Sequence, residues 1–124
     1  MPKFRQSHRL KEIILPNSST PRLNNTQSMF KKCENLQQLD LRFFTTSSVN
    51  NMSYMFDTCS KLTTIIASNS FVTTNVTTEN SVDMFSNCNL LVGGSGTSFN
   101  SSHINKDYAH IDGGTSNPGY FTAN

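Results

Sequence analysis

The sequence is poor in several features that mark common classes of protein. It contains no tryptophan and three cysteines, 15% of its residues are charged, and 35% are hydrophobic. Three cysteines cannot all pair within one chain, which excludes a complete disulfide framework. No apolar run approaches the ~18 residues of a membrane-spanning helix, and the residues after Met1 lack the apolar core of a signal peptide. The sequence as written therefore predicts no membrane insertion.

Uncharged polar side chains take the place of the missing charge and hydrophobic content. Ser, Thr and Asn account for 46 of the 124 residues, whereas Lys and Arg number 10 and Asp and Glu number 8. Such side chains hydrogen-bond to the backbone in turns. Nine phenylalanines and a periodic apolar pattern argue against disorder. The composition favours one small domain built from turns and short strands.

A motif recurs along the chain. Residues 29–41 follow the frame Met-Phe-x-x-Cys-x-x-Leu-x-x-Leu-x-Leu, residues 55–67 repeat it, and residues 84–91 begin it again. The phenylalanines of these copies are 26 and 29 positions apart, and a worn copy at residues 4–15 keeps the aliphatic positions but lacks Met and Cys. A period of this length is the signature of stacked repeats.

Each copy predicts one strand, one turn and one short helix. Alternation at the end of the motif predicts a strand in which Leu39 and Leu41 face the core. Residues 53–59 are typical of a short helix with Ser53 as its N-cap. The cysteines occupy equivalent positions, so we expect a buried column of inert thiols, with one bridge between neighbouring coils as the alternative.

The predicted fold class is α/β. We expect a leucine-rich-repeat-type right-handed solenoid of three to four short coils, which begin near residues 4, 29, 55 and 84. Residues 1–92 would form this solenoid. Residues 93–124 break the period, and we expect a C-terminal β-rich cap there, with a strand at 108–111 that enters a tight turn.

The repeat frame resembles the BspA-like family of bacterial leucine-rich-repeat surface proteins. Residues 44–56, which read Phe-Thr-Thr-Ser-Ser-Val-Asn-Asn-Met-Ser-Tyr-Met-Phe, carry the resemblance almost position for position, and residues 107–122 resemble the closing segment of such arrays. The resemblance implies a solenoid used for binding or adhesion, with no catalytic residues. It also implies a cell-surface or secreted location, whereas the absence of a signal implies a cytoplasmic one if the chain is complete as written.

The best candidates for partner binding are the strand residues that face away from the core, because repeat proteins bind through side chains that recur coil by coil. These residues are Glu12, Ile14, Gln38, Asp40, Arg42, Thr64 and Ile66. Ile14 and Ile66 are apolar where the pattern predicts exposure, so either another segment of the chain or a partner covers them. The mixture of apolar, acidic and amide groups suits a protein better than a phosphate backbone, which needs clustered Lys and Arg.

Positive charge is concentrated towards the N-terminus. Residues 1–42 hold eight of the ten Lys and Arg but three of the eight Asp and Glu. The candidate basic patch comprises Lys3, Arg5, Arg9, Lys11 and Arg22. Such charge is usually solvated at the exposed end of an array. An acidic partner or weak nucleic-acid binding is the alternative, and nucleic acid is not the partner that we expect.

No arrangement of residues points to catalysis. His103, Asp107, His110 and Asp112 carry metal-binding groups, but their spacing matches no known type of site. The glycine-rich run at 93–98 lacks the Lys of a phosphate-binding loop. We therefore expect no catalytic residues, no metal and no cofactor, and we do not expect an enzyme.

Together these features predict a non-catalytic protein-binding module of the surface or adhesin type. A small intracellular inhibitor or adaptor that blocks a partner protein, encoded for example by a phage or mobile element, is the alternative, because the sequence shows no export signal. The identity of the partner stays open. An end-to-end homodimer is a further alternative, since the first coil leaves a strand edge and such edges pair readily.

Overall fold

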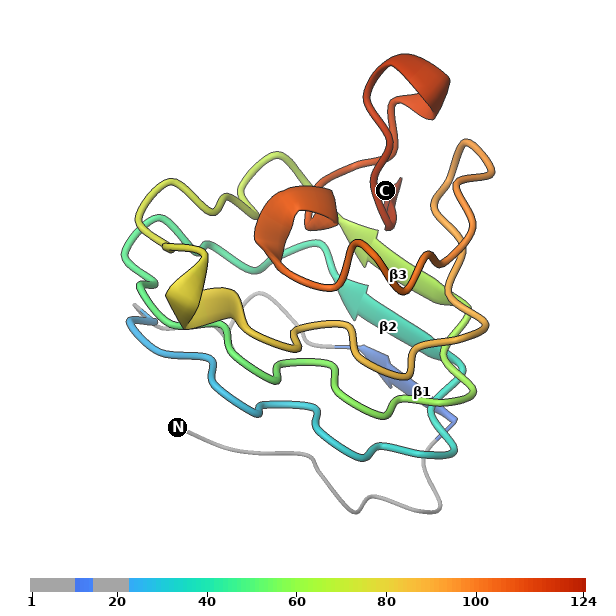
Figure 1. Ribbon diagram of the computed structural model, residues 1–124, viewed down its shortest axis with the longest axis horizontal. Helices are drawn as coiled ribbons and strands as arrows, with labels where there is room; N and C mark the ends of the chain where they lie inside the picture. The colour runs from blue at the N-terminus through green and yellow to red at the C-terminus, as the bar shows by residue number, and fades with distance from the viewer. Residues whose placement is uncertain (1–10, 15–22) are drawn as a thin grey trace.

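The computed structural model describes residues 11–14 and 23–124. These residues contain a parallel four-stranded sheet with the strand order β1-β2-β3-β4. The strands are β1 (Glu12–Ile14), β2 (Gln38–Leu41), β3 (Thr64–Ala67) and β4 (Phe121–Ala123). Figure 1 shows β1, β2 and β3 side by side, with the turn segments of successive repeats running alongside one another.

Successive strands pair with an offset that matches the sequence period. Ile13 pairs with Leu39, and Leu39 pairs with Ile65. All three side chains are buried, as are the paired residues Leu41 and Ala67. The strand positions predicted within the repeat copies, and the inward-facing side chains that the structure describes there, are therefore confirmed.

The predicted short helices are absent from the part of the chain that the structure describes. Residues 53–58 form consecutive turns. The helical elements described are the 3-10 turns η2 (Glu79–Ser81), η3 (Lys106–Tyr108) and η4 (Gly114–Ser116). The helix prediction for 53–59, with Ser53 as its cap, is wrong, and the domain is rich in sheet with almost no helix.

Backbone conformation explains why these segments are not helical. Two residues of each repeat adopt a positive φ, which a right-handed helix does not contain. These residues are Ser28, Lys32, Tyr54, Thr58, Asp83 and Asn87, with φ between 52° and 64°. They stand at equivalent positions of the motif copies at 29–41, 55–67 and 84–91, each taken with the turn before it and called below the first, second and third repeats. The geometry is therefore a property of the repeat.

The turns are stabilised by two kinds of backbone hydrogen bond, one within a repeat and one to the next repeat. The Met55 amide donates to the carbonyl of Met52 within its own repeat (3.2 Å), whereas the Phe56 amide donates to the carbonyl of Met84 in the next repeat (2.9 Å). A helix would direct its amides to its own carbonyls. It would therefore leave neighbouring repeats without these bonds.

Columns of equivalent side chains form the core. Phe30, Phe56 and Phe85 are fully buried and stack, with ring centroids 5.8 Å apart in the first pair and 5.2 Å apart in the second. The three cysteines form a second buried column, as predicted. Burial raises the pKa of Cys88 to about 12, so this thiol stays protonated at neutral pH.

The C-terminal segment supplies the last strand. The third copy of the motif stops at Leu91, but β4 pairs with β3 at Phe121, which lies opposite Ile65. The strand predicted at 108–111 is not formed, and only Ile111 makes a single parallel bridge, to Phe121. Tyr108 instead ends η3, because the Ala109 amide closes that turn on the Lys106 carbonyl (3.0 Å).

Asp112 ties this C-terminal segment together. Its carboxylate accepts hydrogen bonds from the amides of Ser95 (2.8 Å), Thr97 (3.0 Å), Gly114 (3.0 Å) and Gly119 (3.3 Å) and from the Thr97 hydroxyl (2.7 Å). Burial by itself would raise the carboxyl pKa, but these hydrogen bonds outweigh it and hold the pKa of Asp112 well below its usual value.

Phe56→Ala should lower the free energy of unfolding by about 3–5 kcal/mol, the range for deleting a buried aromatic ring. Thr63→Ala, at an exposed residue whose hydroxyl donates to the Gln37 carbonyl (3.1 Å), serves as the control. Its effect should stay near 1 kcal/mol. Urea denaturation measures both, and equal small effects would contradict the stacked core.

Asp112→Asn should lower the free energy of unfolding by about 1–3 kcal/mol at neutral pH, because a charged acceptor of several hydrogen bonds is lost. Since the folded-state pKa of Asp112 is depressed, its contribution is present above the unfolded-state pKa of about 4. It is lost as pH falls below that value. Denaturation from pH 7 to pH 2 should show a shallower decline for the variant than for the natural chain, and identical pH profiles would contradict this role.

Candidate functional site

The outer face of the sheet, meaning the strand side chains that point away from the core, brings the predicted partner-binding residues together. Strand register arranges them in two rows. The first row is Glu12, Gln38 and Thr64, and the second row is Ile14, Asp40 and Ile66. Because alternate residues of a strand share one face, both rows belong to the same surface.

The second row carries accessible apolar groups. Ile14 is 59% exposed, and Ile66 is half-buried. Thr122 of β4 extends this row beside Ile66. The described part of the chain leaves Ile14 open to contact.

Asp40 lies between these two isoleucines but is only 3% exposed. The Arg42 side chain donates to it from Nε (3.1 and 3.0 Å) and from Nη2 (2.7 Å), and the Arg42 amide donates as well (3.0 Å). The expectation of an accessible Asp40 is therefore corrected. At this point the face presents the Arg42 side chain, which is 41% exposed.

The Arg42 guanidinium also sets the charge state of the pair. Its hydrogen bonds hold the pKa of Asp40 below the usual value, although burial opposes them. Hydrogen bonding to Asp40 likewise raises the pKa of Arg42. The pair is therefore ionised at neutral pH, and the arginine is held in place on the surface.

Two residues near this surface escaped the sequence analysis. Phe43 follows Arg42 and is 42% exposed, but it lies beyond the alternating pattern, which ends with β2. Thr122 joins the second row only because β4 comes from a distant segment. The period of the motif gives no signal for it.

The structure describes one member of the predicted basic patch, Lys11. Lys11 is exposed, and its carbonyl accepts hydrogen bonds from the amides of Gln37 (2.6 Å) and Gln38 (3.1 Å). The other members, Lys3, Arg5, Arg9 and Arg22, lie outside the described residues.

The described residues hold no cluster of three or more His, Cys, Asp or Glu side chains arranged for a metal ion. The carboxylate of Asp112 is already occupied by amides and a hydroxyl. The Nδ1 atom of His110 lies 2.8 Å from the carbonyl oxygen of Ile111. The outer face offers aliphatic, amide, hydroxyl and guanidinium groups, together with the carboxylate of the exposed Glu12.

Among the described residues, no helix has both the length and the apolar character needed to cross a bilayer.

Comparison with known proteins gives a family without a known activity. The family model described as "Mycoplasma protein of unknown function, DUF285" matches residues 2–117. No curated protein and no solved structure matches the chain. The description names no ligand and no reaction.

Replacing Arg42 by Met should raise the pKa of Asp40 above its usual value, because burial would then act with fewer opposing hydrogen bonds. In the natural chain the depressed pKa means that Asp40 stabilises the fold above the unfolded-state pKa of about 4 and loses this contribution as pH falls. NMR titration of the Asp40 carboxyl carbon measures the shift. Lys61→Met, at an exposed lysine, is the control and should leave the Asp40 pKa unchanged.

Proposed function

The chain belongs to the family of Mycoplasma proteins of unknown function, DUF285, and from this premise we propose that it is a non-catalytic protein-binding module that contacts its partner through the outer sheet face. The second row of this face carries the proposal, because Ile14 is 59% exposed on an ordered strand. Full burial of an isoleucine side chain stabilises a complex by about 1.5–3 kcal/mol. A partner that covers Ile14 and Ile66 would gain part of that free energy.

The architecture proposed for this module is a leucine-rich-repeat-type right-handed solenoid of the BspA-like kind. Residues 1–92 would form its coils, and residues 93–124 would close it. The constant offset between paired strands supports this proposal. The recurrence of positive-φ residues at equivalent positions of three repeats supports it as well.

The face suits recognition because it is ordered before a partner arrives. Binding costs free energy when side chains and loops must be ordered, and strands of a hydrogen-bonded sheet avoid much of that cost. Asp40 engages Nε and Nη2 of Arg42, which leaves other donors of the guanidinium for a partner. A carbonyl or carboxylate on the partner, placed beside an apolar side chain over Ile14, would match this surface.

Adhesion at a cell surface is the context that we propose, in keeping with the BspA-like resemblance. The partner would then be a surface or matrix protein. Recovery of a single intracellular protein instead would redirect the proposal to an inhibitor or adaptor that uses the same face.

The test compares the natural chain with the double variant Ile14→Lys/Ile66→Lys in capture from intact cells and from lysate. Titration calorimetry with the captured protein follows. Binding should weaken tenfold or more, since apolar contacts at the centre of an interface become buried charges. Thr45→Lys/Asn50→Lys places the same charges at exposed positions outside the face and should bind normally. Equal affinity of both variants, with folding verified by circular dichroism, would reject the outer face as the binding site.

A further inference from the structure

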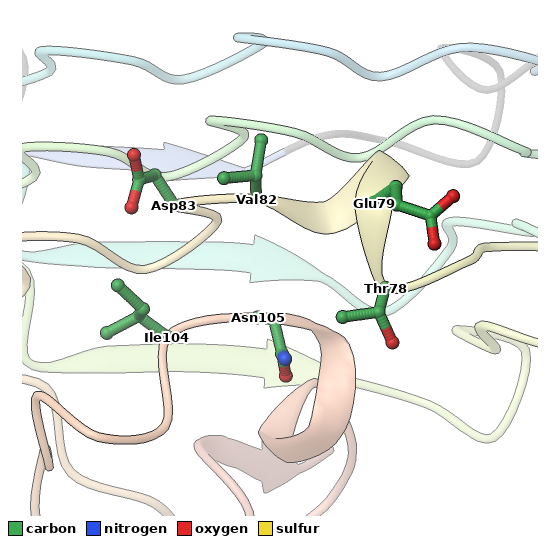
Figure 2. Close-up of a pocket in the computed structure, with 6 residues that line it drawn as sticks. All are labelled: Thr78, Glu79, Val82, Asp83, Ile104 and Asn105. Atoms are coloured by element: carbon green, nitrogen blue, oxygen red, sulfur yellow. The ribbon is translucent and has the colours of Figure 1, made fainter.

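A groove of about 530 Å³ lies between the third repeat and the C-terminal segment. Thr78, Glu79, Val82, Asp83, Ile104 and Asn105 line it. Figure 2 shows Val82 and Asp83 on the stretch that follows η2, with Ile104 and Asn105 on the opposing segment that leads into η3. The volume falls within the range of small-ligand and peptide-side-chain pockets.

The groove coincides with a break in the hydrogen bonding between repeats. In the second repeat, the Ser53 amide donates to the Asn51 side chain (3.0 Å), and the Tyr54 amide donates to the Val82 carbonyl of the next repeat (3.0 Å). The first repeat makes both equivalent bonds. Two consecutive amides are therefore satisfied at this position in each of these repeats.

The equivalent amides of the third repeat are those of Val82 and Asp83, and among the described residues neither donates to another repeat or to the C-terminal segment. The C-terminal segment crosses here and makes hydrogen bonds only on either side. Ile104 accepts from the Phe85 amide (3.0 Å), and the Lys106 amide donates to the Ser81 hydroxyl (3.3 Å). The place that the next repeat's backbone would take beside Val82 and Asp83 is the groove.

The chemistry of the lining restricts what can fill this place. Val82, 42% exposed, and the half-buried Ile104 offer apolar contact. The carboxylates of Glu79 and Asp83 disfavour an anionic acceptor for the two amides, although Lys106 lies close by in the sequence. A neutral peptide carbonyl is the acceptor that fits. The second repeat shows such a pair, because the Tyr54 amide donates to the carbonyl of Val82, whose backbone is extended.

We propose that this groove binds an extended segment of a partner protein in which one apolar side chain lies between Lys or Arg residues. The segment's carbonyls accept from the amides of Val82 and Asp83. Its apolar side chain packs against Val82 and Ile104, and its cations lie near Glu79 and Asp83. The site is separate from the outer sheet face, and the proposal does not depend on that face.

The test is a titration of the ¹⁵N-labelled chain with acetyl-Gly-Ser-Lys-Leu-Arg-Ser-Gly-amide, followed by heteronuclear NMR. The amide protons of Val82 and Asp83 should move downfield and saturate, with a Kd on the order of 1 mM for so short a contact. A matched peptide with Glu in place of Lys and Arg should bind more weakly. No saturable shift of these amides, or equal binding of both peptides, would overturn the proposal.

Variants of the chain assign the contributions. Val82→Ser, which introduces the residue found at the equivalent position of the second repeat, should weaken binding about tenfold through lost apolar contact. Glu79→Gln should weaken it about three- to fivefold, as expected for an exposed charge pair, whereas Glu34→Gln, at an exposed site in the first repeat, should not. Equal effects of the two glutamate variants would refute the charge contribution.

The variant Ile14→Lys/Ile66→Lys, which changes the outer sheet face, tests the location of the peptide site. It should bind the peptide normally, and loss of peptide binding by this variant would mean that the groove is not the site.

Discussion

Each turn segment can satisfy only part of its backbone amides by itself, and this constraint governs the molecule. Alternate amides, such as that of Phe56, need a carbonyl of the next repeat, and an unpaired buried amide costs free energy comparable to a lost hydrogen bond. No repeat can therefore be stable alone. The buried columns of Phe and Cys side chains follow from the same alignment, because repeats that share hydrogen bonds also share register.

The outer sheet face and the groove beside Val82 are both consequences of that alignment. The outer face exists because strands in register place equivalent side chains in rows. The groove exists because the alignment stops. Beside Val82 and Asp83, the C-terminal segment makes one hydrogen bond on either side, whereas a further repeat would make a continuous series. The outer face arises from the repetition and the groove from its interruption, and the two surfaces share no residue.

The parts of this fold that the sequence reveals are those that repeat. The alternation of Leu39 and Leu41 and the 26-residue period were enough to predict β1, β2 and β3 and their alignment. The helix prediction failed because Phe56 and Cys59, three residues apart, fit one face of a helix and a run of turns equally well. The positive φ of Tyr54 and Thr58 excludes the helix and fits the run of turns. Tyrosine and threonine are not residue types that favour a positive φ, so the sequence does not indicate it.

Contacts that occur once are harder to foresee. The sequence does indicate that Asp40 could pair with Arg42, because the two lie two positions apart and alternate residues share one face. The alternating pattern by itself does not show that the two side chains form the ion pair that covers Asp40. The hydrogen bonds of Asp112 and the placement of β4 join segments of unrelated sequence. No periodic signal exists for such contacts, so the accessible composition of the outer face could be only partly predicted.

The pairing of β3 with β4 has a consequence for the protein while it is being made. After Ala67 leaves the ribosome, the partner strand Phe121–Ala123 has not yet been translated, and at 5–20 residues per second the delay is roughly 3–10 s. During that interval the edge of β3 is unpaired, and an unpaired edge is a template for strands of other chains. The nascent polypeptide thus presents an edge, that of β3, which β4 covers in the finished fold.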